Sequence, residues 1–467
     1  MIPKNCTFKI YEYFMDITRL TGKNCQNYDS KETKKTLLKY SKSPYIKDNT
    51  KRIGYPLTNK DPTCFLDFFF TNNLIKKYFD YNLVDMDDEQ ALKEKFKDKM
   101  PEIEVDLTNN KQNKIKINVF YNETLSKERK ILESNSKPYS NNIILLFIDS
   151  VSRANALRQL KKTLKFFEKF ISYKGGKNEN YPSENFHSFQ FFKYISFKGY
   201  TTVNYPLLFY GQKKDNKNKA LITKFFKENG YITSLVHDTC SRDNTRSYHN
   251  FTLEEIYDHE FLICDPNNDN FSLYSKRCLY GKQNIEYLLE YTEQFWNKYV
   301  TNRKLSVIIT NHGHEGTLTL IKYIDEIIYN FLNTLFNNNL LKDSSIFLFS
   351  DHGSGMPSIY YLYDFFKIEM HLPMLFIIIN DRKNISYSKQ YKHIKENQQI
   401  LITAFDIYNT IGHLIYGEKY YFIENKTILK DTFKSKYGIS LFNKINPKAR
   451  VLKKYDQISS INKNICY

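Results

Sequence analysis

The second half of the chain alternates continuous apolar runs with amphipathic segments. Each apolar run has the length of a strand and polar residues at its ends, which is typical of strands buried on both faces of a parallel sheet. The runs are NNIILLFIDS (141–150), YITSLVHD (231–238), KLSVIIT (304–310), SSIFLF (344–349) and MLFIII (374–379). They predict strands that share one buried sheet.

The segments between these runs carry apolar residues at helical spacing. One helix face is predicted to hold Leu157, Leu160, Leu164, Phe167 and Phe170, and another to hold Leu320, Ile324, Ile327, Phe331 and Leu335. A third predicted helix, LITKFFKENG, ends at Gly230, where a C-terminal cap is expected. Alternating strands and helices predict a three-layer α/β/α domain with a mostly parallel central sheet.

The organisation changes at residue 141. Residues 1–140 are polar and weakly periodic, although KIKINVFYN (114–122) alternates like a strand. We expect 1–140 to be an N-terminal extension packed on the core, 141–425 to be the main domain, and 426–467 to be a C-terminal tail that completes it.

Composition and charge narrow the classes of function. Hydrophobic residues make up 41% of the 467 residues and aromatic residues 16%, which excludes a chain that is disordered throughout. The net charge of +18 favours anionic partners, but the lysines are scattered along the chain. Without helix-turn-helix or zinc-finger spacing, we expect no specific binding of nucleic acid.

The cysteines and apolar content bear on the cellular compartment. The sequence contains no stretch of about 18 apolar residues, so we expect no transmembrane helix. The segment MIPKNCTFKIYEY lacks the apolar core of a signal peptide. The cysteines suit either disulfides of a secretory-pathway or extracellular protein or buried free thiols. They are Cys6, Cys25, Cys64, Cys240, Cys264, Cys278 and Cys466. The N-x-S/T sequons permit glycosylation without arguing for it.

Polar residues follow the predicted strands where each strand ends. Asp149, Asp238, His312, Asp351 and His352 all occupy such positions, and ligands of α/β sheets bind beyond the carboxyl ends of the strands. Aspartate and neutral histidine together suit a zinc-like divalent ion, with manganese and calcium as alternatives. The competing interpretation is structural: Asp149 caps the following helix, and the Asp351–His352 pair caps a turn.

The metal-ligand candidates from this pattern are Asp149, Asp351 and His352. His312 or His314 is expected as a further ligand or as a substrate contact. Two ions about 3.5–4 Å apart could clamp the attacking and leaving oxygens of a phosphoryl or sulfuryl group.

The ordered motifs resemble those of the alkaline phosphatase/sulfatase superfamily, and within it those of the DUF229 family. The matching stretches span about residues 140–420 and include LLFIDSVSRANALRQLKKTLKFFEKF, FKGYTTVNYPLLFYG, GYITSLVHD, RCLYG, and SDHG followed by EMHLP. The resemblance implies an alkaline-phosphatase-like fold, a divalent metal of one or two ions, and Asp149, Asp351 and His352 as its ligands.

The resemblance also implies a threonine nucleophile in the T-x-x-N turn. Spacing to Asn204 favours Thr201 over the adjacent Thr202, and Asn204 is expected to orient the transferred group. Two departures matter. Thr310 stands where the superfamily usually has an aspartate, which puts a second metal in question. Cys240-Ser241-Arg242 lacks the proline and spacing of the sulfatase C/S-x-P-x-R motif.

These observations favour a metal-dependent hydrolase or transferase that acts on phosphate esters, less readily on sulfate esters, through a threonine nucleophile. A glycan- or lipid-linked ester would suit the basic surface. The alternative is a catalytically inactive binding or structural ectodomain of the same fold. The sequence leaves the substrate, the metal and the oligomeric state open.

Overall fold

A computed structural model defines the architecture of the chain. It describes residues 37–39, 46–48, 103–106, 114–134, 136–171, 186–211, 222–238, 257–264, 278–279, 282–314, 318, 321–355, 364–380, 389–420, 435 and 437–450. The Cys240-Ser241-Arg242 segment lies outside these residues, as do the side chains of all seven cysteines.

A central sheet of eight described strands organises the fold, in the order β1-β8-β7-β11-β5-β12-β13-β6. The strands are β1 (Leu37–Lys39), β5 (Asn142–Ile148), β6 (Phe186–Gln190), β7 (Ile232–His237), β8 (His259–Cys264), β11 (Lys304–Thr310), β12 (Ser344–Phe349) and β13 (Leu375–Asn380). The five neighbours from β8 to β12 run parallel, whereas β1, β13 and β6 pair antiparallel at the two edges. The predicted buried, mostly parallel sheet is confirmed.

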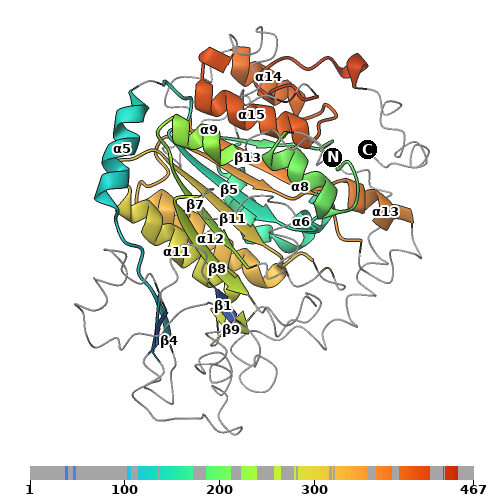
Figure 1. Cartoon of the computed structure of the whole chain (residues 1–467). Coiled ribbons are helices and arrows are strands. Elements are labelled where there is room, and N and C mark those ends of the chain that lie inside the picture. The colour runs from blue at the N-terminus through green and yellow to red at the C-terminus, as the bar shows by residue number, and fades with distance from the viewer. Residues whose placement is uncertain are drawn as a thin grey trace, which may run out of the picture.

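Helices cover both faces of this sheet (Figure 1). One face packs on α7 (Lys161–Glu168), α11 (Asn284–Lys298) and α12 (Lys322–Asn337). The other packs on α8 (Thr201–Phe209), α9 (Ile222–Glu228), α14 (Lys389–Asn397) and α15 (Ala404–Tyr416). Alternate β5 residues explain the two layers, because Ile144 and Leu146 enter the first core and Ile143 and Leu145 enter the second. The predicted α/β/α arrangement is confirmed.

The remaining described elements lie around this core. They are α5 (Glu123–Glu133), α6 (Arg153–Gln159), α13 (Asp364–His371), the 3₁₀ helix η8 (Pro447–Ala449), the β2 (Ile46–Asp48), β3 (Ile103–Asp106) and β4 (Lys114–Ile117) sheet, and the β9 (Cys278–Leu279) and β10 (Lys282–Gln283) pair. None of the described helices is long and apolar enough to cross a bilayer.

Two expectations from the pattern need adjustment. The strand expected over 114–122 is limited to β4, after which Asn122 caps α5 through its side chain. The charged neighbours Lys322 and Glu326 favour a solvated helix position for Asp325, but Asp325 is 7% exposed. Its carboxylate accepts hydrogen bonds from the main-chain N–H groups of Lys162 and Thr163, so it caps α7, as acidic groups do at helix N-termini. The domain boundaries at 140 and 425 stay predictions.

Strand register brings residues that are distant in the sequence together at the carboxyl ends of the parallel strands. Ile148 of β5 pairs with Thr310 of β11, and Phe147 pairs with Phe349 of β12. Because these strands are parallel, the residues that follow them leave the sheet side by side. The segments that begin at Asp149, Asn311 and Ser350 are therefore neighbours.

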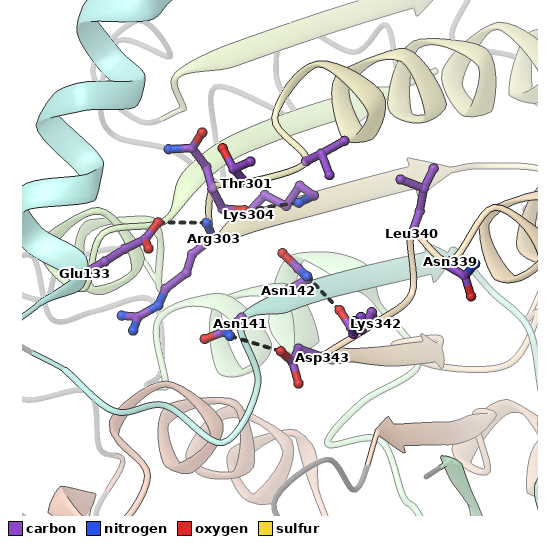
Figure 2. A pocket seen from close by; sticks show the side chains of 12 residues that line it. Glu133, Asn141, Asn142, Thr301, Arg303, Lys304, Asn339, Leu340, Lys342 and Asp343 are labelled. Atoms are coloured by element: carbon purple, nitrogen blue, oxygen red, sulfur yellow. Dashed lines mark hydrogen bonds between the residues drawn. The ribbon is translucent and has the colours of Figure 1, made fainter. Parts of the chain in front are cut away.

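A pocket of about 300 Å³ lies at the amino ends of β5, β11 and β12 (Figure 2). The guanidinium of Arg303 donates to Ser136 and to a main-chain carbonyl. The buried ammonium of Lys304 donates to two main-chain carbonyls. Both basic side chains therefore donate to groups of the protein itself. Strands of this length put the pocket about 20 Å from the predicted site.

Candidate metal centre and active site

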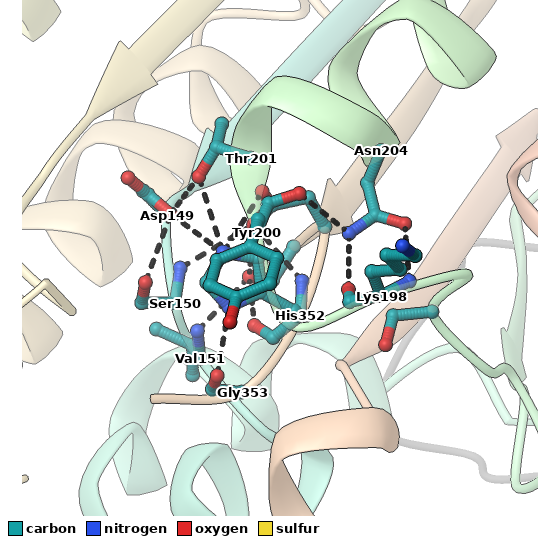
Figure 3. Close-up of polar contacts among 12 residues, drawn as sticks. Asp149, Ser150, Val151, Lys198, Tyr200, Thr201, Asn204, His352 and Gly353 are labelled. Carbon is teal, nitrogen blue, oxygen red and sulfur yellow. Dashed lines mark hydrogen bonds and ion pairs between the residues drawn. The ribbon is translucent and has the colours of Figure 1, made fainter. Parts of the chain in front are cut away.

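Three predicted ligands lie together beyond the ends of β5 and β12, and Figure 3 labels two of them, Asp149 and His352. One ligand atom from each of Asp149, Asp351 and His352 lies within 4.8 Å of the other two. The three residues are 7%, 0% and 4% exposed. Two carboxylates and one imidazole form a donor set suited to a zinc-like ion. The fold therefore assembles a buried group that could hold a divalent cation.

Hydrogen bonds fasten the two loops that carry this group. The N–H of Val151 donates to Ser350 Oγ over 2.9 Å, and Ser350 Oγ donates to the carbonyl of His352 over 2.9 Å. The N–H of His352 donates to Asp351 Oδ1, also over 2.9 Å. Ser150 adopts a left-handed backbone with φ of 62°, a conformation unfavourable for a residue with a Cβ. The loop geometry is thus held by the surrounding contacts.

The orientation of His352 leaves one ring nitrogen for a cation. Nδ1 lies 2.8 Å from the carbonyl of Gly353, so it carries the proton in the neutral ring and donates it there. Nε2 then faces Asp351 Oδ2 at 3.3 Å and Asp149 Oδ1 at 3.9 Å. Asp351 Oδ2 is buried and accepts no hydrogen bond from a described residue. An orphaned carboxylate oxygen opposite an imidazole lone pair fits a bound divalent ion.

The protonation of this group reflects the crowding of buried charges. Burial raises the pKa of Asp351 to about 6, with an upward contribution from Asp149 and a downward one from His352. Burial lowers the pKa of His352, but the carboxylates of Asp351 and Asp149 outweigh it, and the pKa lies above its ordinary value. Without a metal, the group therefore holds protons near neutral pH that a cation would displace.

Metal binding should weaken as the pH falls. A cation needs Asp351 ionised and His352 neutral, and below about pH 6 protons occupy both. We expect zinc affinity to fall as the pH drops below the pKa of each group, by about tenfold per pH unit for each displaced proton, with Asp351 contributing below about pH 6. Isothermal titration calorimetry between about pH 8 and about pH 5 measures the change, and the Thr202→Ala variant should give the same profile. An affinity that does not vary with pH would contradict this assignment of the ligands.

Thr201 lies against the same group, at the first residue of α8. Its Oγ1 is 3.2 Å from Asp149 Oδ1 and 3.1 Å from His352 Nε2. Thr202 is exposed, and the helix places it one position further round. Tyr200 supplies no side-chain cap to α8, so the first N–H groups of the helix favour an anion there. Of the two predicted threonines, the structure places Thr201 at the group.

Asn204 does not face the group but holds the turn that leads to Thr201 (Figure 3). It is fully buried. Its Oδ1 accepts from the N–H of Phe197 at 2.9 Å, and its Nδ2 donates to the carbonyls of Lys198 and Tyr200. The expected contact with the transferred group is thus replaced by contacts with the main chain. Asn204 positions the nucleophile candidate.

Replacing Asn204 with alanine should destabilise the fold. The change strips buried main-chain groups of their partners, so the free energy of unfolding should fall by on the order of 3 kcal/mol. Urea denaturation measures the loss. The exposed Thr202→Ala change serves as the control and should stay within about 0.5 kcal/mol of the wild type. Equal stability of the two variants would show that the turn does not depend on Asn204.

His312 and His314 do not join the group. His312 Nδ1 lies 2.6 Å from Thr310 Oγ1 and 3.3 Å from Asp238 Oδ2, and its Nε2 lies 3.1 Å from Gln283 Oε1. Carboxylate and amide oxygens only accept, so both ring nitrogens of His312 already face acceptors. The grouping of described ligand atoms includes neither histidine. Both therefore lie beside the predicted centre rather than within it.

The departure at Thr310 has a structural explanation. Its Oγ1 donates to Asp238 Oδ2 over 2.7 Å, and Asp238 Oδ1 accepts from the N–H of Asn311 at 2.8 Å. Asp238 thus has a structural role here, because both of its carboxylate oxygens accept hydrogen bonds from the turn after β11. Gly313 follows in the same turn, and a Cβ there would lie 2.2 Å from the carbonyl of Asp149. This turn packs directly against the metal-ligand candidates.

His371 lies near the site, although its apolar sequence neighbours in EMHLP favour a histidine of the core. It is half-buried, and its Nδ1 lies 3.2 Å from Ser196 Oγ. The preceding carbonyl, of Met370, accepts from the N–H of Gly353, which follows His352. Burial lowers the pKa of His371, and the charge of His352 lowers it further. Its apolar sequence neighbours in EMHLP concealed this position.

One family model matches slightly more than half of the chain. The model describes a "protein of unknown function (DUF229)" and covers residues 208–453. The chain belongs to the DUF229 family. The family resemblance predicted from the sequence is confirmed, and the match includes the segments of β12 and the Asp351–His352 pair.

One curated relative and several solved structures are similar to parts of this DUF229 chain at low sequence identity. A lipoteichoic acid synthase of Staphylococcus saprophyticus is 24% identical over 159 residues, which are 31% of this chain and 24% of that protein. The match thus spans about a quarter of the relative's length. Among solved structures, the zinc complex of the periplasmic domain of EcEptC from Escherichia coli is 10% identical, with a TM-score of 0.42 over 68% of this chain and 96% of that one.

Two further solved structures are similar at the same level. The lipoteichoic acid synthase LtaP of Listeria monocytogenes is 11% identical, with a TM-score of 0.42 over 69% of this chain and 82% of that one. A protein in the alkaline phosphatase superfamily from Vibrio parahaemolyticus is 13% identical, with a TM-score of 0.39 over 64% of this chain and 76% of that one.

Proposed function

We propose that this protein is a metal-dependent hydrolase or transferase of phosphate esters, with Thr201 as nucleophile. The observation that carries the proposal is the position of Thr201 Oγ1, 3.2 Å from Asp149 and 3.1 Å from His352. A hydroxyl of ordinary pKa is a weak nucleophile and needs a neighbouring base or cation to react. Asp149 is a neighbouring base, and the group formed by Asp149, Asp351 and His352 could hold the cation.

Asp149, Asp351 and His352 would hold the ion, and zinc suits their donor set best. When bound, a divalent ion supplies charge that stabilises the phosphoryl oxygens and lowers the pKa of a nearby hydroxyl. The rest of the chemistry belongs to the chain.

The reaction follows from the contacts of Thr201. Asp149 Oδ1 accepts a hydrogen bond from the threonine hydroxyl and is placed to receive its proton. The Thr201 Oγ1–phosphorus bond then forms while the bond to the leaving alcohol breaks, and that alcohol takes a proton from solvent. Water or a second alcohol next releases the phosphoryl group from Thr201. The N-terminus of α8 favours the negative charge that the group carries.

We infer a glycan- or lipid-linked phosphate ester as the substrate. The net charge of +18 favours an anionic partner, and the partial similarity to a lipoteichoic acid synthase supports this class. A threonine hydroxyl favours phosphate over sulfate esters, since sulfatases of the usual kind depend on a modified cysteine or serine.

Metal analysis followed by turnover assays tests the proposed function. The purified chain should retain a divalent ion and cleave p-nitrophenyl phosphate faster than p-nitrophenyl sulfate, and a chelator should abolish both reactions. Adding an alcohol such as glycerol shows whether the phosphoryl group passes to water or to an acceptor. Absence of a bound ion, with no turnover after addition of zinc, manganese or calcium, would contradict the proposal that the protein is a metal-dependent enzyme.

A catalytically inactive ectodomain is the second candidate. Thr310 favours it, because a hydroxyl bonded to Asp238 stands where the superfamily usually has an aspartate. Turnover assays distinguish the two candidate functions, because an inactive protein would bind zinc at the same residues yet hydrolyse neither ester.

A further inference from the structure

Three buried side chains at β7 and β8 carry polar atoms without a hydrogen-bond partner. The atoms are Nε2 of His237, both carboxylate oxygens of Glu260, and the phenol oxygen of Tyr257. His237 and Glu260 are each 1% exposed, and Tyr257 is 0% exposed. Partners among the described residues are absent for all of these atoms, although nearly every buried polar group of a folded protein has one.

Strand register directs His237 and Glu260 to the same face of the sheet. Glu260 of β8 pairs with Leu235 of β7, two residues before His237. Residues two apart on a strand share a face, and Leu235 and Tyr257 belong to the core beneath α8, α9 and α15. Nε2 of His237 lies 3.8 Å from Oε1 of Glu260.

Tyr257 lies in the same buried core as Leu235, just before β8. Burial raises the pKa of its phenol well above the ordinary value, and Tyr210 and Glu260 raise it further. The phenol therefore stays neutral.

The energetics of this cluster favour a further group. His237 offers Glu260 an ion-pair partner only when its ring is protonated, and a buried carboxylate that accepts no hydrogen bond costs several kcal/mol, a large share of the roughly 5–15 kcal/mol that stabilises a folded protein. A separation of 3.8 Å is too long for a direct hydrogen bond between imidazole and carboxylate. It does suit two ligands of one ion, because atoms bound at about 2.0–2.2 Å lie at most about 4.4 Å apart.

We propose that His237 Nε2 and Glu260 bind a second divalent ion of the zinc class. Imidazole and carboxylate are ligands that zinc accepts. The residue after His237, Asp238, is fixed by hydrogen bonds from Thr310 and from the N–H of Asn311. The end of β7 is thus held rigidly, and the ion would join it to β8.

This site is separate from the Asp149–Asp351–His352 group. Strand β11 lies between β7 and β5, so the two sites are about 10 Å apart. Two ions that act on one phosphoryl group lie about 3.5–4 Å apart. The role of the second ion is therefore structural, and its presence does not depend on the proposed reaction.

Zinc stoichiometry tests the proposal. After zinc loading and desalting, the wild-type chain should retain two equivalents by mass spectrometry of the metal. Glu260→Gln and Asp351→Asn should each retain one equivalent, and the double variant none. His237→Gln is the second cluster variant and should also lose one equivalent.

Thermal unfolding in the Asp351→Asn background gives a second readout, which does not depend on counting metal equivalents. A chelator should lower the melting temperature there, and Glu260→Gln should remove this response. If no ion binds, Glu260→Gln deletes an unpaired buried charge, so it would raise the melting temperature and leave the zinc content unchanged. That result, or a wild type with one equivalent that Asp351→Asn removes entirely, overturns the second site whether or not the proposed reaction is found.

Discussion

Thr201→Ala should reduce turnover of a phosphate ester by at least about a thousandfold, because it removes the attacking oxygen. The hydroxyl lies 3.2 Å from Asp149 Oδ1 and 3.1 Å from His352 Nε2, and no other described hydroxyl shares both contacts. Steady-state kinetics with p-nitrophenyl phosphate measures the loss. The variant should still bind one equivalent of zinc at the Asp149 group, since the three ligand residues are unchanged.

Two neighbouring variants control this experiment. Thr201→Ser keeps a hydroxyl at the same position and should retain measurable turnover. Thr202→Ala alters an exposed residue one position further along α8 and should turn over the ester like the wild type. If Thr202→Ala is inactive and Thr201→Ala is active, the nucleophile is Thr202 and the assignment made from the helix is wrong.

Asp351→Asn should abolish both metal binding at the Asp149 group and turnover. The amide keeps the size of the carboxylate, and its oxygen can still accept from the N–H of His352. It removes the negative charge at Oδ2, which accepts no hydrogen bond from a described residue. Metal analysis, ester hydrolysis and zinc-dependent thermal unfolding together measure the effect. With chelator present, the melting temperatures of the variant and the wild type should differ less than they do with zinc, because neither protein then holds the ion.

Asp406→Asn provides a matched control for a buried carboxylate. Asp406 is fully buried, but it caps α15 and pairs with Arg450 at 2.6 Å. Its substitution should lower the melting temperature and leave the zinc content of the folded protein unchanged. Loss of zinc from both variants would mean that metal retention reports general stability. Retention of zinc by Asp351→Asn would exclude Asp351 as a ligand.

The candidate site was only partly predictable from the sequence. Asp149, Asp351 and His352 follow buried strands, and parallel pairing makes such strand ends neighbours. The same reasoning included His312 and His314, which the fold engages elsewhere or leaves outside the group. A strand end fixes the place of the main chain, whereas the direction of each side chain depends on contacts with other segments. The ring of His312 turns toward Asp238 on the neighbouring strand.

The residues around the nucleophile show the same limit. The T-x-x-N spacing indicated both Thr201 and Asn204, but only the start of α8 separates their roles. Asn204 turns back to bond the main chain before the helix, while Thr201 reaches the metal-ligand candidates. His371 had a core-like sequence context, and the contact of the C-terminal end of α13 with Gly353 brings it near His352.

The sequence by itself determined the strands, the helices and the α/β/α layering. These depend on hydrophobic periodicity, which is a local property of each segment. It did not determine that β13 runs antiparallel to β12, that Asp325 caps a different helix, or that His237 and Glu260 meet without hydrogen-bond partners among the described residues. Each of these depends on contacts between residues far apart in the chain, because a buried polar group is satisfied by whichever segment the fold places beside it. Only the tertiary structure specifies that neighbour.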